Sequence, residues 1–211
     1  MVHEVHGGSC FKFQGDGRVI FTGEDTNIGA SAHFQLKFKT KKHTGIIYYA
    51  EGMYHRERVY DFEGVFLRDG YVNYFLFNPP EYSIGSTFGF HGRSRETLND
   101  GKWHTVEWFR NRKSEVRSKG GKNEMTTQTG LIVDGKLVAV ADGERVGVDI
   151  RPPYILGEDP HLDDRASKVI GSYEGNVMDF RELTTSHEFE TERNMTGQVS
   201  HCIPGPDIEP V

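Results

Sequence analysis

The chain has 211 residues, of which 25 are glycine and 12% are aromatic, and its formal net charge is −6 at pH 7. This length suits one large domain or two small ones and is enough to bury a hydrophobic core. The negative charge gives the molecule no electrostatic reason to bind nucleic acid or an anionic membrane. No run of about 18 apolar residues occurs, so no membrane-inserted helix is expected. The opening MVHEVH lacks the apolar centre of a signal peptide, which indicates an excised piece or a mature segment behind an added Met.

Short segments in which apolar and polar residues alternate recur between turn signals, and no stretch shows a convincing helical period. Phe34, Leu36 and Phe38, for example, are separated by polar residues, which predicts one buried face and one wet face. So many short strands at hairpin spacing favour an all-β antiparallel sandwich. The strands are expected within 11–21 (around Gly-Asp-Gly at 15–17), 34–39, 46–49, 65–67, 72–77, 106–109, 131–133, 137–140, 154–156 and 177–180.

Two stretches interrupt this rhythm and are expected to be long surface loops. Residues 78–97 contain two adjacent prolines and several glycines, and residues 111–129 are polar and rich in Lys and Arg. Loops of this length in a compact domain are usually functional or disordered. We expect one domain over 10–202, between a short N-terminal linker or added segment at 1–9 and a Pro-rich linker at 203–211.

Cys10 and Cys202 are the only cysteines, and they lie near opposite ends of the chain. A zinc or redox site usually has its cysteines within a few residues of one another, so neither kind of site is expected. If the first and last strands of a sandwich lie side by side, the two residues can form a disulfide; the alternative is two unrelated free thiols. Asn194-Met195-Thr196 is the only acceptable N-glycosylation sequon, and a single sequon supports a secreted protein only weakly.

A hairpin near the middle of the chain carries the clearest family pattern. LNDGKWHTVEWFR at 98–110 indicates a tight turn and a strand, and LIVDGK at 131–136 a second strand and turn. This hairpin resembles the central hairpin of laminin G-like domains, the extracellular modules of laminins, agrin, perlecan and neurexins. Further segments resemble the family's motifs in the family's order, so the resemblance covers about residues 11–202. They are FQLKFKT (34–40), GIIYY (45–49), DFEGVFLRDG (61–70), PYILG (153–157) and YEGNVMD (173–179).

The resemblance implies a two-sheet antiparallel jelly-roll sandwich, an extracellular location (secreted or in the ectodomain of a membrane protein) and a binding role, not an enzymatic one. The long insertion after Arg110 resembles neurexin- and contactin-associated-like proteins in particular. Family members often carry a cysteine where this chain has Asn176, paired with a cysteine further on. Because that local disulfide cannot form here, the resemblance implies a disulfide between Cys10 and Cys202.

Calcium-binding members of the family hold one ion at a rim of the sandwich, with two acidic or amide side chains and two main-chain carbonyls. The resemblance places the side-chain ligands at Asp61 and Asp149 and the carbonyl ligands near Asn78 and Gly147. Ca²⁺ prefers hard oxygen ligands, and two carboxylates with water give weak binding, with a Kd on the order of 10⁻⁴–10⁻³ M. The alternative is that both aspartates are ordinary exposed acids at strand ends. On the family interpretation, the chain is a calcium-assisted module that binds a cell-surface or matrix protein or a glycan.

Basic side chains form a second candidate surface. Laminin G-like domains commonly bind sulfated or acidic glycans, and Lys and Arg make charge-assisted contacts to such groups. The alternative is that these are solvated charges that keep strand edges from aggregating. The candidate glycan-binding residues are Lys37, Lys39, Lys41, Lys42, Arg112, Lys113, Arg117 and Lys119.

An enzymatic role has little support in the sequence. Asp61 and Glu63 are two residues apart and share a face of a strand, as the catalytic acids of sandwich glycosidases do, but Val65 and Leu67 stand where a third acid is needed. No nucleophile elbow, zinc-protease motif or phosphate-binding loop occurs. The histidines are scattered, and His104 is expected to be structural. The alternatives to calcium-assisted binding are an acidic-glycan-binding lectin-like module, a structural spacer domain and a sandwich-fold glycosidase.

Overall fold

The computed structural model of the chain describes residues 9–22, 28–52, 61–78, 89–117, 121, 123–158, 170–189, 192 and 194–203. Within this part of the chain no helix is long and apolar enough to cross a membrane. The described strands are β1 (Cys10–Phe21), β2 (Ala32–Lys39), β3 (Gly45–Glu51), β4 (Phe62–Arg68), β5 (Tyr71–Phe77), β6 (Phe90–Arg93), β7 (His104–Arg117), β8 (Asn123–Val133), β9 (Lys136–Asp142), β10 (Arg151–Leu156), β11 (Glu174–Glu182), β12 (His187–Glu188) and β13 (Asn194–His201).

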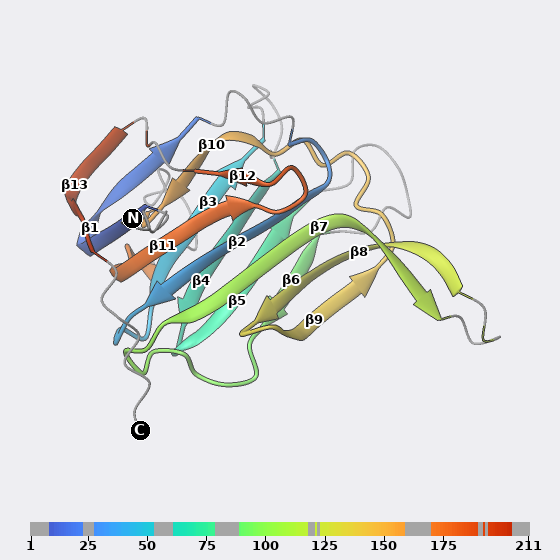
Figure 1. The fold of residues 1–211 in the computed structure, drawn as a ribbon, viewed down its shortest axis with the longest axis horizontal. Coiled ribbons are helices and arrows are strands. Elements are labelled where there is room, and N and C mark those ends of the chain that lie inside the picture. The colour runs from blue at the N-terminus through green and yellow to red at the C-terminus, as the bar shows by residue number, and fades with distance from the viewer. Residues whose placement is uncertain are drawn as a thin grey trace, which may run out of the picture.

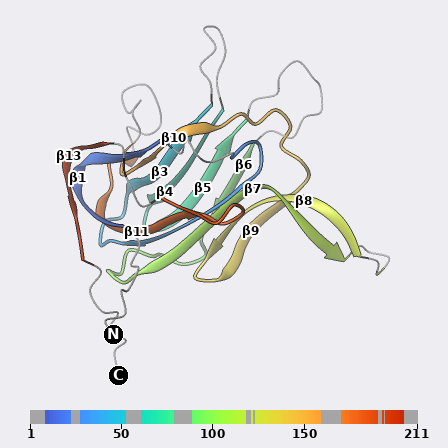
Figure 2. The ribbon, with the colours of Figure 1, turned by 45° about the horizontal axis from the view of Figure 1, so that its top comes forward.

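The strands form two stacked layers of an antiparallel jelly-roll sandwich (Figures 1 and 2). One layer has the order β6-β5-β4-β3-β10, and the other has the order β11-β2-β7-β8-β9. β1 joins the layers, because it pairs with β11 along Cys10–Gln14 and with β10 along Val19–Phe21. β13 pairs with the outer side of β1, and β12 pairs with β11. The sandwich predicted from the strand pattern is therefore confirmed.

The glycine pair at 15 and 17 makes a bend inside β1, which runs through these residues as one strand. β1 stays paired with β13 on both sides of an irregularity between Phe13 and Gly17. A Cβ atom at Gly17 would lie 2.6 Å from the carbonyl oxygen of Thr196, so only glycine allows the approach of β13. The bend is the point at which β1 passes from one layer to the other.

The core between the layers is rich in aromatic residues. Phe34 of β2 stacks on Trp108 of β7 with ring centroids 5.4 Å apart, and on Phe180 of β11 at 5.8 Å. The alternation predicted for β2 is confirmed, since Phe34, Leu36 and Phe38 are fully buried while the residues between them are not. These contacts hold the layer that carries the long β7–β8 hairpin.

The expected loop at 111–129 is wrong, because β7 and β8 continue through most of it. Cross-strand pairs run from Arg112 opposite Gln128 to Arg117 opposite Asn123. Thr and Val residues in this polar stretch favour an extended strand, and pairing across the hairpin outweighs the absence of a buried face. The hairpin extends past β9 at one end of the molecule (Figure 2). The other expected loop, 78–97, contains β6, and its residues 79–88 lie outside the described chain.

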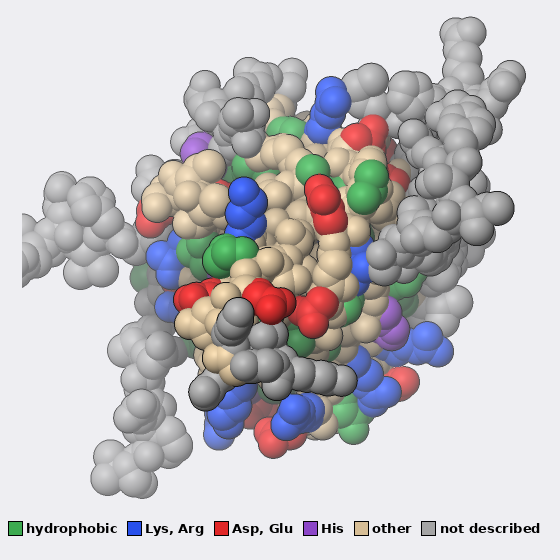
Figure 3. Space-filling model, turned by 90° about the vertical axis from the view of Figure 1, so that its right-hand side faces the viewer, with side chains coloured by type: hydrophobic (Ala, Val, Ile, Leu, Met, Phe, Trp, Pro, Cys, Tyr) green, Lys and Arg blue, Asp and Glu red, His purple; other side chains and the backbone are tan. Residues whose placement is uncertain are grey.

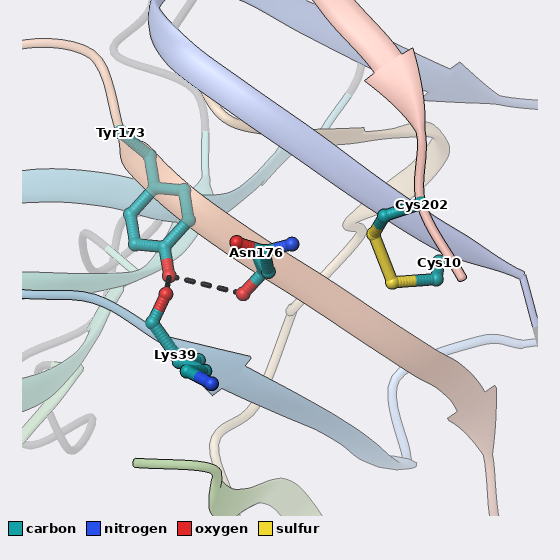
Figure 4. The surroundings of a disulfide bond; sticks show 5 residues. All are labelled: Cys10, Lys39, Tyr173, Asn176 and Cys202. Atoms are coloured by element: carbon teal, nitrogen blue, oxygen red, sulfur yellow. Dashed lines mark hydrogen bonds between the residues drawn. A yellow bond between two sulfur atoms is a disulfide. The ribbon is translucent and has the colours of Figure 1, made fainter. Parts of the chain in front are cut away.

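The chain ends are joined by a disulfide between Cys10 at the start of β1 and Cys202 just after β13 (Figure 4). The Cα atoms are 5.0 Å apart, and the N–H of Cys202 donates to the carbonyl oxygen of Cys10. The structure thus has the pairing that the resemblance implies. Asn176, at the usual cysteine position, lies on neighbouring β11, where its carbonyl oxygen is 3.1 Å from the hydroxyl of Tyr173.

Candidate functional site

Asp61 and Asp149 meet at one rim of the sandwich, although they are 88 residues apart in sequence. Asp61 directly precedes β4, and Asp149 lies in the segment that leads into β10. The N–H of Asp149 donates to Oδ2 of Asp61 at 3.0 Å. The carbonyl oxygen of Asp61 accepts from the N–H of Gly52 at 2.8 Å, and Asp61 is only 7% exposed. Both the main chain and the carboxylate of Asp61 are therefore held in place.

Gly52 makes room for the second carboxylate. A Cβ atom at this position would lie 2.0 Å from Oδ1 of Asp149, which is closer than any real contact allows. Any side chain at position 52 would therefore require the Asp149 carboxylate to move. Sequence reasoning missed this residue; the one available signal was a glycine three residues after the predicted strand 46–49.

Asn78 and Gly147 lie at the same rim. Phe62 of β4 pairs with Phe77 of β5, so the same register carried one residue further brings Asn78 beside Asp61. The Asn78 side-chain amide donates to the carbonyl oxygen of Val146 at 3.0 Å, directly before Gly147. The structure therefore brings together all four positions that the resemblance implied as calcium ligands.

Asn111, at the irregularity in the middle of β7, anchors the rim segment, and sequence reasoning missed this role. Its backbone has a φ of 48°, a left-handed conformation that Asn tolerates better than most residues. Its side-chain oxygen accepts from the N–H of Arg145 at 2.7 Å, and its amide donates to the carbonyl oxygens of Arg145 (2.9 Å) and Ala30 (3.2 Å). The segment that carries Gly147 and Asp149 is thus fixed two residues before Gly147.

Glu63, the second acid considered for a glycosidase, is fully buried between the layers. Its carboxylate accepts from the hydroxyls of Tyr48 (2.8 Å) and Tyr74 (3.0 Å) and is paired with Arg110 (2.5 Å). Burial alone lowers the pKa of Arg110, but the charge of Glu63 raises it above its ordinary value. Burial and the same carboxylate raise the pKa values of both tyrosines. Glu63 is a core ion-pair partner that a substrate cannot reach.

Several of the candidate glycan-binding lysines and arginines contact other side chains of the described part of the chain. Lys37 pairs with Asp179 at 2.9 Å, and Lys42 pairs with Glu174 at 3.1 Å. Figure 3 shows side chains of both charges across the described part of the face that the hairpin end presents. Lys39 lies over Trp103, Lys41 packs beside Gly101, Arg112 stacks on Phe109 and Lys113 is exposed, while the Arg117 side chain and Lys119 lie outside the described residues.

His104 links two turns, as expected of a structural residue. Its ring nitrogens lie 2.9 Å from Asp134 Oδ2 and 3.1 Å from Asp100 Oδ1. Burial raises the pKa of Asp100, but hydrogen bonds from the Lys102 N–H and from His104 lower it more. Among the described residues, no three His, Cys, Asp or Glu side chains lie close enough together to hold a metal ion by themselves. Any cation at the rim therefore needs main-chain oxygens as well as the two aspartates.

Comparison with known proteins decides the family. The model of the laminin G domain family matches residues 38–183, which is more than half of the chain. The chain belongs to the laminin G domain family. Laminin G domains are typically extracellular, non-enzymatic modules that bind proteins and glycans.

Solved structures show the same fold at low sequence identity. Domains LG4-5 of the mouse laminin α1 chain have a TM-score of 0.66 and 17% identity over 94% of this laminin G domain and 47% of that chain. The LG1-3 region of the laminin α2 chain has a TM-score of 0.67 and 18% identity over 93% and 35%. A heptameric pentraxin of Limulus polyphemus has a TM-score of 0.56 and 11% identity over 93% and 95%.

The laminin G domain described here thus spans less than half the length of either laminin fragment. Comparison with curated proteins finds no match.

Proposed function

We propose that this laminin G domain is an extracellular recognition module whose rim around Asp61 and Asp149 binds a cell-surface or matrix protein or a glycan with the help of one Ca²⁺. The observation that carries the proposal is the 3.0 Å hydrogen bond from the Asp149 N–H to Oδ2 of Asp61. This bond holds two acidic residues side by side near the starts of two different strands. Two neighbouring acids are suited to holding a cation and not to apolar core packing.

The residues present fit a calcium ion. A carboxylate has about four lone-pair sites, so a carboxylate can take part in more than one interaction at a time. Gly52 leaves space against the Asp149 carboxylate, and the Asn78 side chain bonds the residue before Gly147 at the same rim, where the main-chain carbonyls of Asn78 and Gly147 would complete the ligand set. These are the hard oxygen donors that Ca²⁺ prefers. A bound cation would also offset the repulsion between the two carboxylates.

Two further features support an extracellular setting. The Cys10–Cys202 disulfide is of a kind that persists in oxidising compartments. Asn194 of the sequon is exposed at the first position of β13, an edge strand, so a glycan there would meet solvent. A glycan on this edge would also block pairing with another strand.

Thermal unfolding with and without calcium tests the proposal. Wild-type protein should melt at a higher temperature in millimolar CaCl₂ than in EGTA, because a ligand that binds only the folded state stabilises it. Asp61→Asn keeps an acceptor for the Asp149 N–H but removes the charge, and it should abolish that calcium-dependent rise. Glu144→Gln, an exposed acid in the same segment, is the matched control and should keep it. An unchanged rise in Asp61→Asn, or no rise in the wild type, would overturn the calcium site.

A further inference from the structure

The outer face of β4, β5 and β6 carries cations and aromatic rings together. Val72 and Tyr74 of β5 are fully buried in the core, so the residues that alternate with them point outward. Strand register places outward residues of β4 and β6 directly beside those of β5. The β4–β6 face, as we call it, consists of Arg68, Tyr71, Asn73, Phe75, His91 and Arg93.

Contacts among its members hold this face in shape. The guanidinium carbon of Arg93 lies 3.7 Å from the ring centroid of Tyr71. Oδ1 of Asn73 is 3.1 Å from Nε2 of His91, and the Asn73 amide donates to the carbonyl oxygen of Tyr71 at 2.9 Å. The His91 ring also meets Phe75 edge-on, with centroids 6.0 Å apart. A surface ordered in this way loses little side-chain freedom when it binds a partner.

The face is positively charged although the whole chain carries a net charge of −6. Arg68, His91 and Arg93 are exposed, and no carboxylate of the described residues pairs with His91 or Arg93. Asp69 approaches Arg68 only to 4.0 Å, with both side chains largely exposed. Burial and then the charges of Arg93 and Arg68 lower the pKa of His91, as expected beside unneutralised cations.

The chemistry of the face favours a peptide over a sugar. Its exposed polar groups are cationic donors, and its half-buried groups are the rings of Tyr71 and Phe75. The Asn73 side chain is only 3% exposed, and its amide and oxygen are already engaged with Tyr71 and His91. Sugar hydroxyls need acceptors as well as donors. The two arginines offer donors only, which leaves the Tyr71 hydroxyl and one ring nitrogen of neutral His91 as the acceptors that these residues offer. Carboxylates next to an apolar side chain match both the guanidinium groups and the rings.

We propose that the β4–β6 face docks an acidic segment of a partner protein, in which Asp or Glu side chains flank an apolar residue. Arg68 and Tyr71 lie at the opposite ends of β4 and β5 from Asp61 and Asn78. The arginine end of this surface therefore lies away from the rim, and the docking proposed here goes beyond the function proposed for the rim and needs no calcium.

Binding of a fluorescein-labelled peptide, EEFEEFEE, in EGTA tests this proposal by fluorescence anisotropy. Wild-type protein should bind it, more weakly at high salt because salt screens exposed charges, and should not bind KKFKKFKK. Arg68→Glu/Arg93→Glu should weaken binding by at least about tenfold, since it replaces attraction with repulsion. Lys113→Glu/Lys136→Glu has the same net charge, changes exposed cations of the other layer and should bind like the wild type. Binding should also raise the pKa of His91, followed by NMR, because a carboxylate stabilises the imidazolium.

Four results would overturn the proposal. The first is an equal loss of peptide binding in the two double variants, and the second is peptide binding that requires calcium. The third is that Arg68 and Arg93 bind a heparin fragment but not the peptide. The fourth is dimerisation of the wild type, seen by sedimentation, that Arg68→Glu/Arg93→Glu abolishes. The heparin result would assign the face to a glycan, and the last result would assign it to a second copy of this chain. The peptide assay is run in EGTA and repeated in CaCl₂ only to detect a calcium requirement, so failure of the calcium site leaves the test of this face intact.

Discussion

The guanidinium of Arg110 on β7 is paired with the carboxylate of Glu63 on β4, and both side chains are fully buried. This pair joins the two layers of the sandwich through its core, and the hydroxyls of Tyr48 and Tyr74 donate to the same carboxylate. Removing one partner would leave the other charge buried without compensation. Arg110→Met should therefore lower the free energy of unfolding by about 3–5 kcal/mol. Urea denaturation measures the loss, and a change within about 0.5 kcal/mol, as at an ordinary surface site, would contradict the role assigned to the pair.

The disulfide should stabilise the protein by restricting the unfolded chain. Cys10 and Cys202 are 192 residues apart, and the chain-entropy model gives about 5 kcal/mol for so long a loop. Cys10→Ala/Cys202→Ala should therefore melt well below the wild type under non-reducing conditions, and the wild type in reductant should approach the variant. Mass analysis that finds two free thiols in protein from an oxidising compartment would contradict the pairing.

Stability should fall in acid partly through Glu107. His33 Nε2 lies 3.0 Å from Oε2 of Glu107, and Gln35 donates to Oε1 at 3.1 Å. The hydrogen bond with His33, against the opposing effect of burial, lowers the pKa of Glu107 in the folded state. Its stabilising contribution is therefore present above the unfolded pKa, about 4.3, and is lost as the pH falls below that value. Glu107→Gln should flatten the decline in unfolding free energy between pH 5 and pH 3, whereas exposed Glu124→Gln should not. If unfolding free energy declines equally with pH in the wild type and both variants, Glu107 is not a source of the acid sensitivity.

Asn111 should support both the middle of β7 and the rim. Asn111→Gly keeps the left-handed backbone but loses the bonds to Arg145 and Ala30, and it should cost about 1–3 kcal/mol for unpaired buried groups. Asn111→Ala should cost more, because Ala also strains a φ of 48°. Both variants should bind calcium more weakly than the wild type if the anchored segment carries ligands. If Asn111→Gly leaves both stability and calcium binding unchanged, the anchoring role assigned to Asn111 is contradicted.

Local pattern predicted much of the fold but not its long-range geometry. Alternation along 34–39 identified a half-buried strand, because every second side chain of a strand points to the same face of the sheet. The bend of β1 depends on how closely β13 approaches Gly17, and that neighbour is 180 residues away. The polar hairpin strands around Arg112 and Thr127 have no buried face, so no hydrophobic period marked them.

The candidate site shows the same limit. Asp61 and Asp149 were found through the family pattern, since nothing in the local sequence indicates that residues 88 apart meet. Gly52 and Asn111 act through the space they leave and the main-chain groups they hold, and such roles appear only once the chain is folded.

Calorimetric titration of calcium into chelator-treated, dialysed protein tests the central claim most directly. We predict single-site binding to the wild type with a Kd on the order of 10⁻⁴–10⁻³ M, the same binding to Glu144→Gln, and none to Asp61→Asn. Heat of binding that is absent from the wild type, or that persists unchanged in Asp61→Asn, would contradict a calcium-assisted rim at Asp61 and Asp149.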